Sequence, residues 1–175
     1  PSTMDAEEAT PPAVRLVLGT MTMGPALGTD HVDGKHTRMP SYCQTPPEVA
    51  LEQLQALADC PAARVSSGPE AGKVLVDTAS AYQNWCTEST LGAIFAAHPE
   101  LRERISIHSK ANSGQLPHQS LSKESVLYQC NGSLERLQSA AIDIYYLHGP
   151  DINTPIDETL EAIGELHTAG ECRTC

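Results

Sequence analysis

Short apolar runs alternate with longer amphipathic stretches along the chain, and this alternation limits the possible folds more than any other feature. The apolar runs, rich in β-branched residues, cover residues 14–19, 73–77, 104–110 and 142–148. Apolar residues at helical spacing fill the stretches at about 45–59, 87–98, 121–138 and 154–170. Strands that alternate with helices are typical of β-α units, whose strands run parallel in one sheet. We therefore expect an α/β domain of about four β-α units.

Two of the helical stretches begin with a threonine followed by a proline. Thr45 opens the segment TPPE, in which Glu48 completes a capping box. Thr154 and a proline precede Asp157, which places a carboxylate in the first turn of the last helix. Gly170 suits a left-handed C-cap. These signals predict helix starts at the two threonines and an end at the glycine.

The charge balance of the chain excludes several classes of partner. Eleven basic residues against 22 acidic ones give a net charge of −11, without a Lys/Arg cluster, so a nucleic-acid partner is not expected. No membrane partner is expected either, because no apolar run approaches the roughly 20 residues of a spanning helix. Six cysteines without a secretory signal favour reduced thiols and a cytoplasmic location. Residues 1–13 are interpreted as a flexible arm, and residues 14–175 as one domain.

Polar side chains end three of the apolar runs, at the edge where a parallel α/β sheet gathers its chemistry. Asp77 ends the second run, Lys110 the third and His148 the fourth. Tyr82 lies in the loop that follows Asp77. Parallel neighbours lie about 4.8 Å apart, so the second and fourth strands are roughly 10 Å apart, a gap that Lys and Tyr side chains can close. We predict that these four side chains converge on one site.

Three segments around these residues resemble the aldo-keto reductases: DTASAYQNWCTESTLG at 77–92, SKAN at 109–112 and SLERLQSAAIDIYYLHGPD at 133–151. LGTMTMG at 18–24 and YYLHGPDINTPIDETLEAIGELHTAGE at 145–171 are similar to the aflatoxin-aldehyde reductase branch. The resemblance runs from about Val14 to Cys172. It implies a truncated TIM barrel, the N-terminal half of that fold. It also implies that the family's catalytic tetrad consists of Asp77, Tyr82, Lys110 and His148.

The resemblance implies reduction of an aldehyde or ketone with hydride from NADPH. Tyr82 would donate a proton to the alkoxide, and Lys110, held cationic by Asp77, would favour the phenolate that remains. His148 would orient and polarise the carbonyl through a hydrogen bond. Taken singly, each residue also has an ordinary structural interpretation. Asp77 could be a helix or turn cap, and Tyr82 a half-buried loop aromatic. Lys110 could be a solvated surface charge, and His148 a hydrogen-bonded histidine at a strand end.

Other residues are candidates for holding the cofactor and the substrate. By the resemblance, the nicotinamide side of the site comprises Gly19, Thr20, Met21, Asp77 and His148. The substrate would contact Trp85, Tyr82 and His148. An aromatic ring beside the phenol suits an apolar carbonyl compound, although Trp85 could instead pack its own loop down.

No metal site is expected in the chain. Cys172 and Cys175 have metal or redox spacing, but one such pair at a chain end is more often incidental. His31, Asp33 and His36 share a loop, for which a solvated polar loop is favoured over a metal site.

The chain is short for the barrel that it resembles, since a complete barrel takes about 250 residues. By the resemblance, the groups that stack on nicotinamide and hold the adenosine phosphate lie beyond the expected units. Open edges on the first and fourth strands invite association, so we expect two copies to pair into a full barrel as a homodimer. The alternative is a monomer whose edges are shielded by the 24–44 loop and the 60–72 connection.

Three functions stay open on the sequence alone. The first is an NADPH-dependent carbonyl reductase completed by a partner. The second is a cofactor-independent acid/base enzyme, such as an isomerase, dehydratase or cyclase, that reuses Tyr82, Lys110 and His148. The third is a non-catalytic partner subunit.

Overall fold

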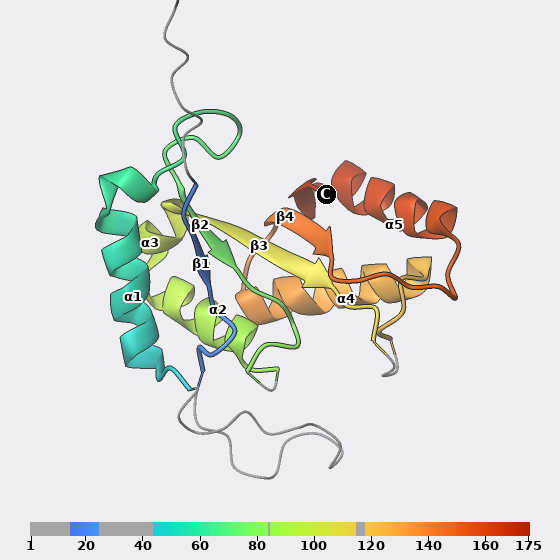
Figure 1. Cartoon of the computed structure of the whole chain (residues 1–175), viewed down its shortest axis with the longest axis horizontal. Coiled ribbons are helices and arrows are strands. Elements are labelled where there is room, and N and C mark those ends of the chain that lie inside the picture. Colours follow the sequence, from blue (N-terminus) through green and yellow to red (C-terminus); the bar gives the residue numbers. More distant parts are fainter. Residues whose placement is uncertain (1–14, 25–43, 84, 115–117) are drawn as a thin grey trace, which may run out of the picture.

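Five parallel strands form one sheet, in the same order in space as in the sequence (Figure 1). The computed structural model describes residues 15–24, 44–83, 85–114 and 118–175. The strands are β1 (Val17–Gly19), β2 (Val74–Asp77), β3 (Ile105–Ala111), β4 (Ile142–Leu147) and β5 (Cys172–Thr174). The four expected strands are confirmed, and the fifth pairs with β4 near the end of the chain.

The helices pack on one face of this sheet as a partial α/β barrel. They are α1 (Pro47–Asp59), α2 (Thr87–Ala97), α3 (Pro99–Glu103), α4 (Lys123–Leu137) and α5 (Ile156–Ala169), with a 3₁₀ turn at η2 (Pro61–Ala63). Parallel strands in sequential order are joined by right-handed crossovers, which place the helices on the same side. In agreement, α4 contacts both α2 and α5. The opposite side of the sheet is called the inner face below.

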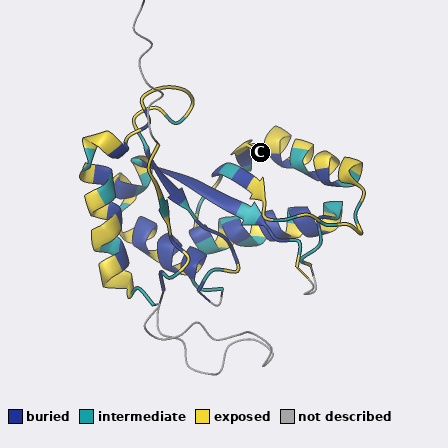
Figure 2. Cartoon of the chain, viewed as in Figure 1, coloured by how far each residue is buried: buried dark blue, intermediate teal, exposed yellow. Residues whose placement is uncertain are grey.

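The hydrophobic core lies between the sheet and the helices, where Figure 2 shows the buried surfaces. Val76, Ile105 and Ile107 supply its strand side and are fully buried. Its helix side includes Leu54, Leu91, Val126, Leu137 and Leu166. Burial of such a side chain contributes about 1.5–3 kcal/mol, so this layer dominates the stability of the fold. Successive side chains along a strand point to opposite faces of the sheet. The residues that pack into the core therefore fix which of their neighbours face inward.

The predicted helix starts at the two threonines are wrong. The N-caps are Pro46 and Pro155, and neither makes a side-chain cap. The hydroxyl of Thr45 instead lies 3.0 Å from that of Thr22, and Thr154 donates to Asp151 Oδ2 at 2.8 Å. Each threonine therefore bonds a neighbouring loop rather than the helix it precedes. The left-handed end at Gly170 is confirmed.

The expectation of reduced thiols is wrong for the last two cysteines. Cys172 and Cys175 form a disulfide, so this pair is bonded rather than incidental. The chain returns after β5 to a Cα–Cα distance of 6.6 Å, which is within reach of such a bond. Cys60 and Cys130 are free thiols. Among the described helices, none has the length and apolar character needed to cross a membrane.

The connection between α1 and β2 folds over the amino end of the inner face. Glu70 accepts hydrogen bonds there from Ser106 Oγ and, at 2.6 Å, from His108 Nε2. The other ring nitrogen of His108 lies 3.4 Å from the hydroxyl of Tyr146. We call Glu70, Ser106, His108 and Tyr146 the basal cluster. It shows that the 60–72 connection shields part of the inner face, whereas most of the 24–44 loop and residues 1–13 lie outside the described residues.

Candidate active site

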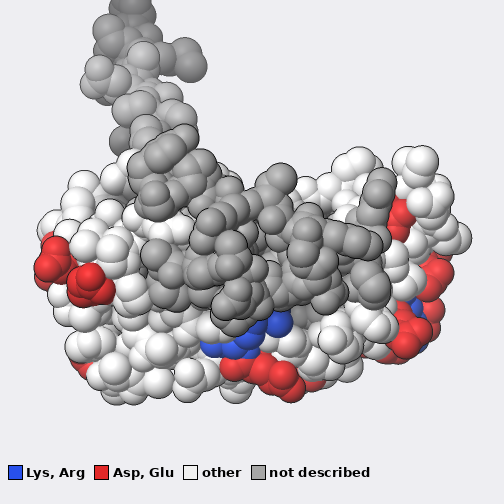
Figure 3. Space-filling view, turned by 90° about the horizontal axis from the view of Figure 1, so that it is seen from below, with Lys and Arg blue, Asp and Glu red and all other residues white. Residues whose placement is uncertain are grey.

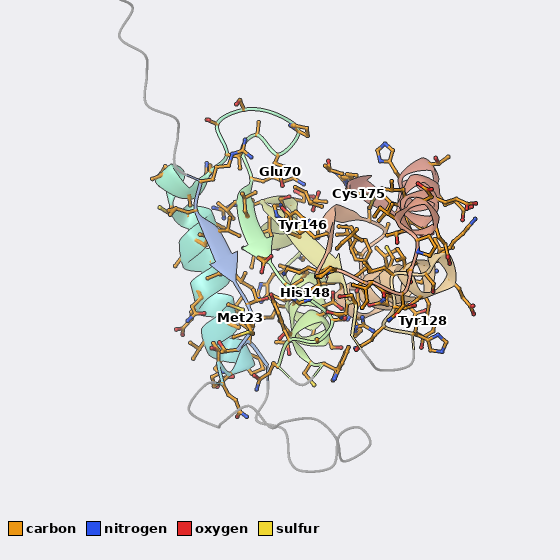
Figure 4. All side chains as sticks on the ribbon, turned by 45° about the vertical axis from the view of Figure 1, so that its right-hand side comes forward. Met23, Glu70, Tyr128, Tyr146, His148 and Cys175 are labelled. Carbon is orange, nitrogen blue, oxygen red and sulfur yellow. A yellow bond between two sulfur atoms is a disulfide. The ribbon has the colours of Figure 1, made fainter. Side chains whose placement is uncertain are left out.

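The predicted tetrad residues lie at the carboxyl ends of three neighbouring strands. Asp77 is the last residue of β2, Lys110 lies at the end of β3, and His148 follows β4 directly. Ser109 donates to the buried Glu88 on α2, so it faces the helices. Its neighbour Lys110 must then face inward, because successive side chains alternate. Figure 4 shows His148 at the end of the sheet opposite to Glu70.

Lys110 joins the carboxylate and the phenol in one hydrogen-bonded group. Its Nζ lies 2.7 Å from Asp77 Oδ1, donates to the Tyr82 hydroxyl at 3.0 Å, and donates to the carbonyl of Thr78 at 2.7 Å. The Tyr82 hydroxyl in turn donates to Asp77 Oδ2 at 3.4 Å. These contacts use all three donors of the ammonium group. The cation is therefore held in one place beside the phenol.

His148 stands edge-on to the phenol ring. The ring centres of Tyr82 and His148 are 6.0 Å apart, with planes at 80°. Burial lowers the pKa of His148, and the charge of Lys110 lowers it further, against the opposing charge of Asp77. The imidazole is thus neutral at pH 7. The structure brings together all four residues that the sequence singled out.

At the end of β1, two of the three predicted cofactor residues face open space. A Cβ added to Gly19 would meet no atom within 4 Å, and Met21 is 53% exposed. Thr20 is fully buried, and both its amide and its Oγ1 donate to the carbonyl of Asp77. The side chain of Thr20 therefore ties β1 to the end of β2. Gly19, whose register partner is Asp77, and Met21 are therefore not covered by the described part of the chain.

Trp85 lies in the turn between Tyr82 and α2. Its backbone adopts a φ of 71°, in the left-handed region, and its side chain is partly buried. This turn also contains Gln83, which has a positive φ and whose amide donates to Met21. The turn that carries Tyr82 is thereby linked to the segment that follows β1.

Sequence reasoning missed one residue of this site. Asn112 Oδ1 lies 2.7 Å from Nδ1 of His148, and Asn112 is itself buried. A usable signal was present, because Asn112 follows Lys110 by two residues and therefore shares its face of the strand.

Basic side chains in the described part of the chain mostly have acidic partners. Figure 3 shows acidic groups at both ends of one face and a small basic group that adjoins acidic ones. The ion pairs join Lys73, Arg102 and Arg173 to Asp143, Arg104 to Asp59, Lys123 to Glu161 and Glu165, and Arg136 to Glu88. Among the described residues, no group of three or more His, Cys, Asp or Glu side chains could hold a metal ion. The loop with His31, Asp33 and His36 is outside these residues.

Known proteins share both the sequence and the fold of this chain. It is 34% identical to human aflatoxin B1 aldehyde reductase member 2 over 161 residues, which cover 92% of this chain and 36% of that protein. It is 38% identical to the human member 4 over 104 residues, covering 58% of this chain and 30% of the relative. The chain thus spans about a third of the length of these curated relatives.

A solved structure agrees with the sequence relatives. The holo form of an aldo-keto reductase from Bacillus halodurans superimposes with a TM-score of 0.59 at 26% identity, covering 91% of this chain and 44% of that chain. The model of the Aldo/keto reductase family matches residues 26–175, a span that contains all four tetrad residues. The chain therefore belongs to the aldo-keto reductase family.

Proposed function

We propose that this chain carries the catalytic tetrad of an aldo-keto reductase, which reduces an aldehyde or ketone with hydride from NADPH. The observation that supports this most is the position of the Lys110 ammonium, 2.7 Å from the Asp77 carboxylate and 3.0 Å from the Tyr82 hydroxyl. Tyr82 is the proton donor in this proposal. An adjacent cation favours the phenolate left behind, while Asp77 keeps the lysine charged.

His148 is placed to orient the substrate in this proposal. It stands edge-on to the Tyr82 ring at the same end of the sheet. Hydrogen bonding to a polarised oxygen lowers the barrier to addition at the carbon. Trp85 is a further substrate contact, as its indole lies in the same turn as Tyr82. The names of the human relatives specify an aldehyde, which supports an aldehyde over other carbonyl compounds.

The nicotinamide end of NADPH fits the residues present. Gly19 leaves open space, Met21 is exposed, and Asp77 and His148 border the same edge of the sheet. Thr20 contributes by holding β1 to β2 rather than by direct contact. When bound there, the cofactor would supply hydride. Residues from outside these strands would hold the adenosine phosphate, because the described basic side chains mostly serve in ion pairs.

A second copy of the chain completes the barrel in this proposal. The outer strand β1 exposes its backbone edge, and Leu16 and Val17 are 48% and 50% exposed. On the inner side, Tyr146 is 42% exposed. Unpaired parallel strands and apolar side chains of this kind favour pairing with further strands. The mass of the 175-residue chain in solution tests this part directly, and a monomer at micromolar concentration would contradict it.

A cytoplasmic location stays part of the proposal. The free thiols of Cys60 and Cys130 accord with a reducing compartment, whereas the bond between Cys172 and Cys175 does not. Measuring the redox state of this pair in the cell would test the location.

The deciding experiment is a titration of the purified chain with NADPH, followed by cofactor fluorescence, together with turnover of an aldehyde series. We expect saturable binding and turnover, with Tyr82→Phe retaining binding and losing turnover. Tyr128→Phe is the matched control, because Tyr128 is a 60% exposed tyrosine on α4, away from the tetrad. Turnover without any NADPH binding would favour the acid/base enzyme. Absence of both would favour the non-catalytic subunit.

A further inference from the structure

Three basic side chains converge on one buried carboxylate near the amino end of the sheet. Asp143, on β4, is 5% exposed. Lys73 Nζ lies 3.2 Å from its Oδ1, and Arg173 Nε lies 3.6 Å from the same oxygen. Arg102 donates to the other carboxylate oxygen at 3.3 Å. These cations come from the residue before β2, from α3 and from β5, so the fold forms a basic group that the sequence does not show.

This group holds more positive than negative charge. In the described part of the chain, every other ion pair of a lysine or arginine has at least one carboxylate for each cation. At Asp143, three cations share a single carboxylate. Glu70 also acts electrostatically on Asp143, but it already accepts hydrogen bonds from Ser106 and His108. Cations remain in excess even when Glu70 is counted.

The two arginines of the group repel each other. Burial lowers the pKa of Arg102 from its usual value, the carboxylate of Asp143 raises it, and the charge of Arg173 lowers it further. Like charges that lie close together disfavour one another, and an opposite charge placed near both relieves the repulsion. A bound anion would therefore be stabilised by this group.

Unused hydrogen-bond donors accompany the excess charge. Within the described residues, the side chains of Lys73 and Arg173 have no hydrogen-bond or ion-pair partner besides Asp143. An ammonium group has three N–H donors and a guanidinium five, so most of these donors are available. The side chain of Arg173 is 64% exposed and that of Lys73 is 23% exposed, so a solute can reach both.

The spacing of these donors suits a small tetrahedral anion. Lys73 Nζ and Arg173 Nε contact the same oxygen of Asp143, so their separation cannot exceed the sum of those two contacts. Charged N–H groups bind phosphate oxygens at about 2.7–2.9 Å, so donors this close can bind different oxygens of one phosphate group. Phosphate carries about two negative charges at neutral pH, which suits a group with excess cations.

We propose that Lys73, Arg102 and Arg173 form a binding site for a phosphate group, either the free ion or a small phosphate ester. Asp143 gathers the three cations. It lies five residues before His148 along the same chain segment, which corresponds to about 16 Å at the rise of a parallel strand. The site is thus separate from the tetrad, and it does not rest on the proposed function.

The test is NMR titration of the ¹⁵N-labelled chain with inorganic phosphate and, separately, with glycerol phosphate. Chloride keeps the ionic strength constant, because salt screens exposed charges. We expect saturable shifts of the Arg102 and Arg173 Nε–Hε signals, and binding of acetate, with its single charge, that is weaker by about tenfold or more. The tighter of the two phosphates identifies the free ion or an ester as the ligand. Shifts without saturation, or acetate binding as tight as phosphate, would overturn the proposal.

Arg173→Gln removes the most exposed cation of the group and leaves the buried carboxylate paired. We expect the affinity for phosphate to fall about tenfold, because a charged donor to the anion is lost. Arg173→Lys keeps the charge without the planar fork, so its affinity should stay within about threefold of the wild type. Unchanged affinity in Arg173→Gln would contradict the proposal.

Arg104→Gln is the matched control, because Arg104 also lies next to α3 but pairs one-to-one with Asp59. Its affinity for phosphate should stay within about twofold of the wild type, since a paired exposed cation contributes little. Equal losses in Arg173→Gln and Arg104→Gln would mean that phosphate responds to the overall charge of the chain, and would overturn the site. These measurements need neither NADPH nor turnover, so they stand apart from the test of the reductase.

Discussion

The inner face of the sheet carries two polar clusters built from the same kinds of side chain. The tetrad at the carboxyl end has a carboxylate, a phenol and an imidazole in Asp77, Tyr82 and His148. The basal cluster at the amino end has the same three groups in Glu70, Tyr146 and His108. On β3, His108 of the basal cluster and Lys110 of the tetrad are two residues apart, as are Tyr146 on β4 and His148 directly after it.

The clusters differ in closure and in charge. The side chains of Glu70 and His108 are 14% and 5% exposed, whereas that of Asp77 is 28% exposed and His148 lies at the surface. Lys110 gives the tetrad a permanent cation, while the basal cluster has the hydroxyl of Ser106 in the corresponding place on β3. We therefore expect the predicted tetrad, which has a cation and solvent access, to serve chemistry. We expect the Glu70–His108 pair, which the 60–72 connection covers, to serve stability.

Removal of the Lys110 cation should reveal the largest difference in function between the two clusters. We expect Lys110→Met to lower turnover by about 10²–10³-fold, because one preorganised charged donor at the reacting group is lost. Glu70→Ala should leave turnover within about threefold, since it touches only the basal cluster. The measurement is NADPH oxidation with an aldehyde substrate. Equal losses of turnover in Lys110→Met and Glu70→Ala would contradict this difference between the tetrad and the basal cluster.

Stability should respond in the opposite way. Glu70→Ala leaves the buried Ser106 and His108 without their acceptor, which we expect to lower the free energy of unfolding by about 1–3 kcal/mol. Glu103→Ala, at an exposed site on α3, should stay within about 0.5 kcal/mol of the wild type. Urea titrations measure both. A Glu70 variant as stable as the Glu103 control would show that the loop does not seal the inner face.

Acid should weaken the basal cluster through its carboxylate, Glu70. Burial raises the pKa of Glu70, but hydrogen bonds from Ser106 and His108 outweigh it and hold the pKa below its usual value. Because the folded pKa is lower than the unfolded one, this stabilisation is present above about pH 4.5 and is lost as the pH falls through the folded pKa. Denaturant midpoints of wild type and Glu70→Gln should therefore converge on acidification. A constant gap down to pH 3 would contradict this.

The smallest expected effect concerns the imidazole of the tetrad. The charge of Lys110 contributes to the lowered pKa of His148, so Lys110→Met should raise that pKa toward 6.5. A lowered histidine pKa means that the unfolded chain binds more protons, so this group costs stability as the pH falls below about 6.5. NMR titration of the His148 ring measures the shift. A further fall of the pKa in Lys110→Met would show that another charge dominates.

The sequence predicted that Asp77, Tyr82, Lys110 and His148 converge because three of them end apolar runs and all four sit in family motifs. Asp77, Lys110 and His148 each follow directly from strand placement, and the parallel order brings those ends to one edge. The basal cluster had a weaker signal. Ser106, His108 and Lys110 lie at every second position of β3 and so share one face. Glu70, the partner of Ser106 and His108, lies in a connection whose path no local pattern specifies.

The helix starts show a different limit of sequence reasoning. Thr45 and Thr154 have the right residue type in the right place for caps, yet each hydroxyl bonds another loop residue, Thr22 and Asp151. A tertiary partner replaced the local one in both cases. The short α3 was missed because Pro99–Glu103 is too brief for a periodic pattern. Asn112 was missed as a site residue because an asparagine after a strand is usually assigned to a turn.

The spatial order of the strands, which equals their order in the chain, also bears on how the molecule is made. Each β-α unit emerging from a ribosome meets the free side of the unit synthesised just before it, so every described strand after β1 finds its first neighbour already made. Contacts close in sequence form early in folding. The sheet can therefore grow by stepwise addition during translation, with its newest side always the one ready to accept the next strand.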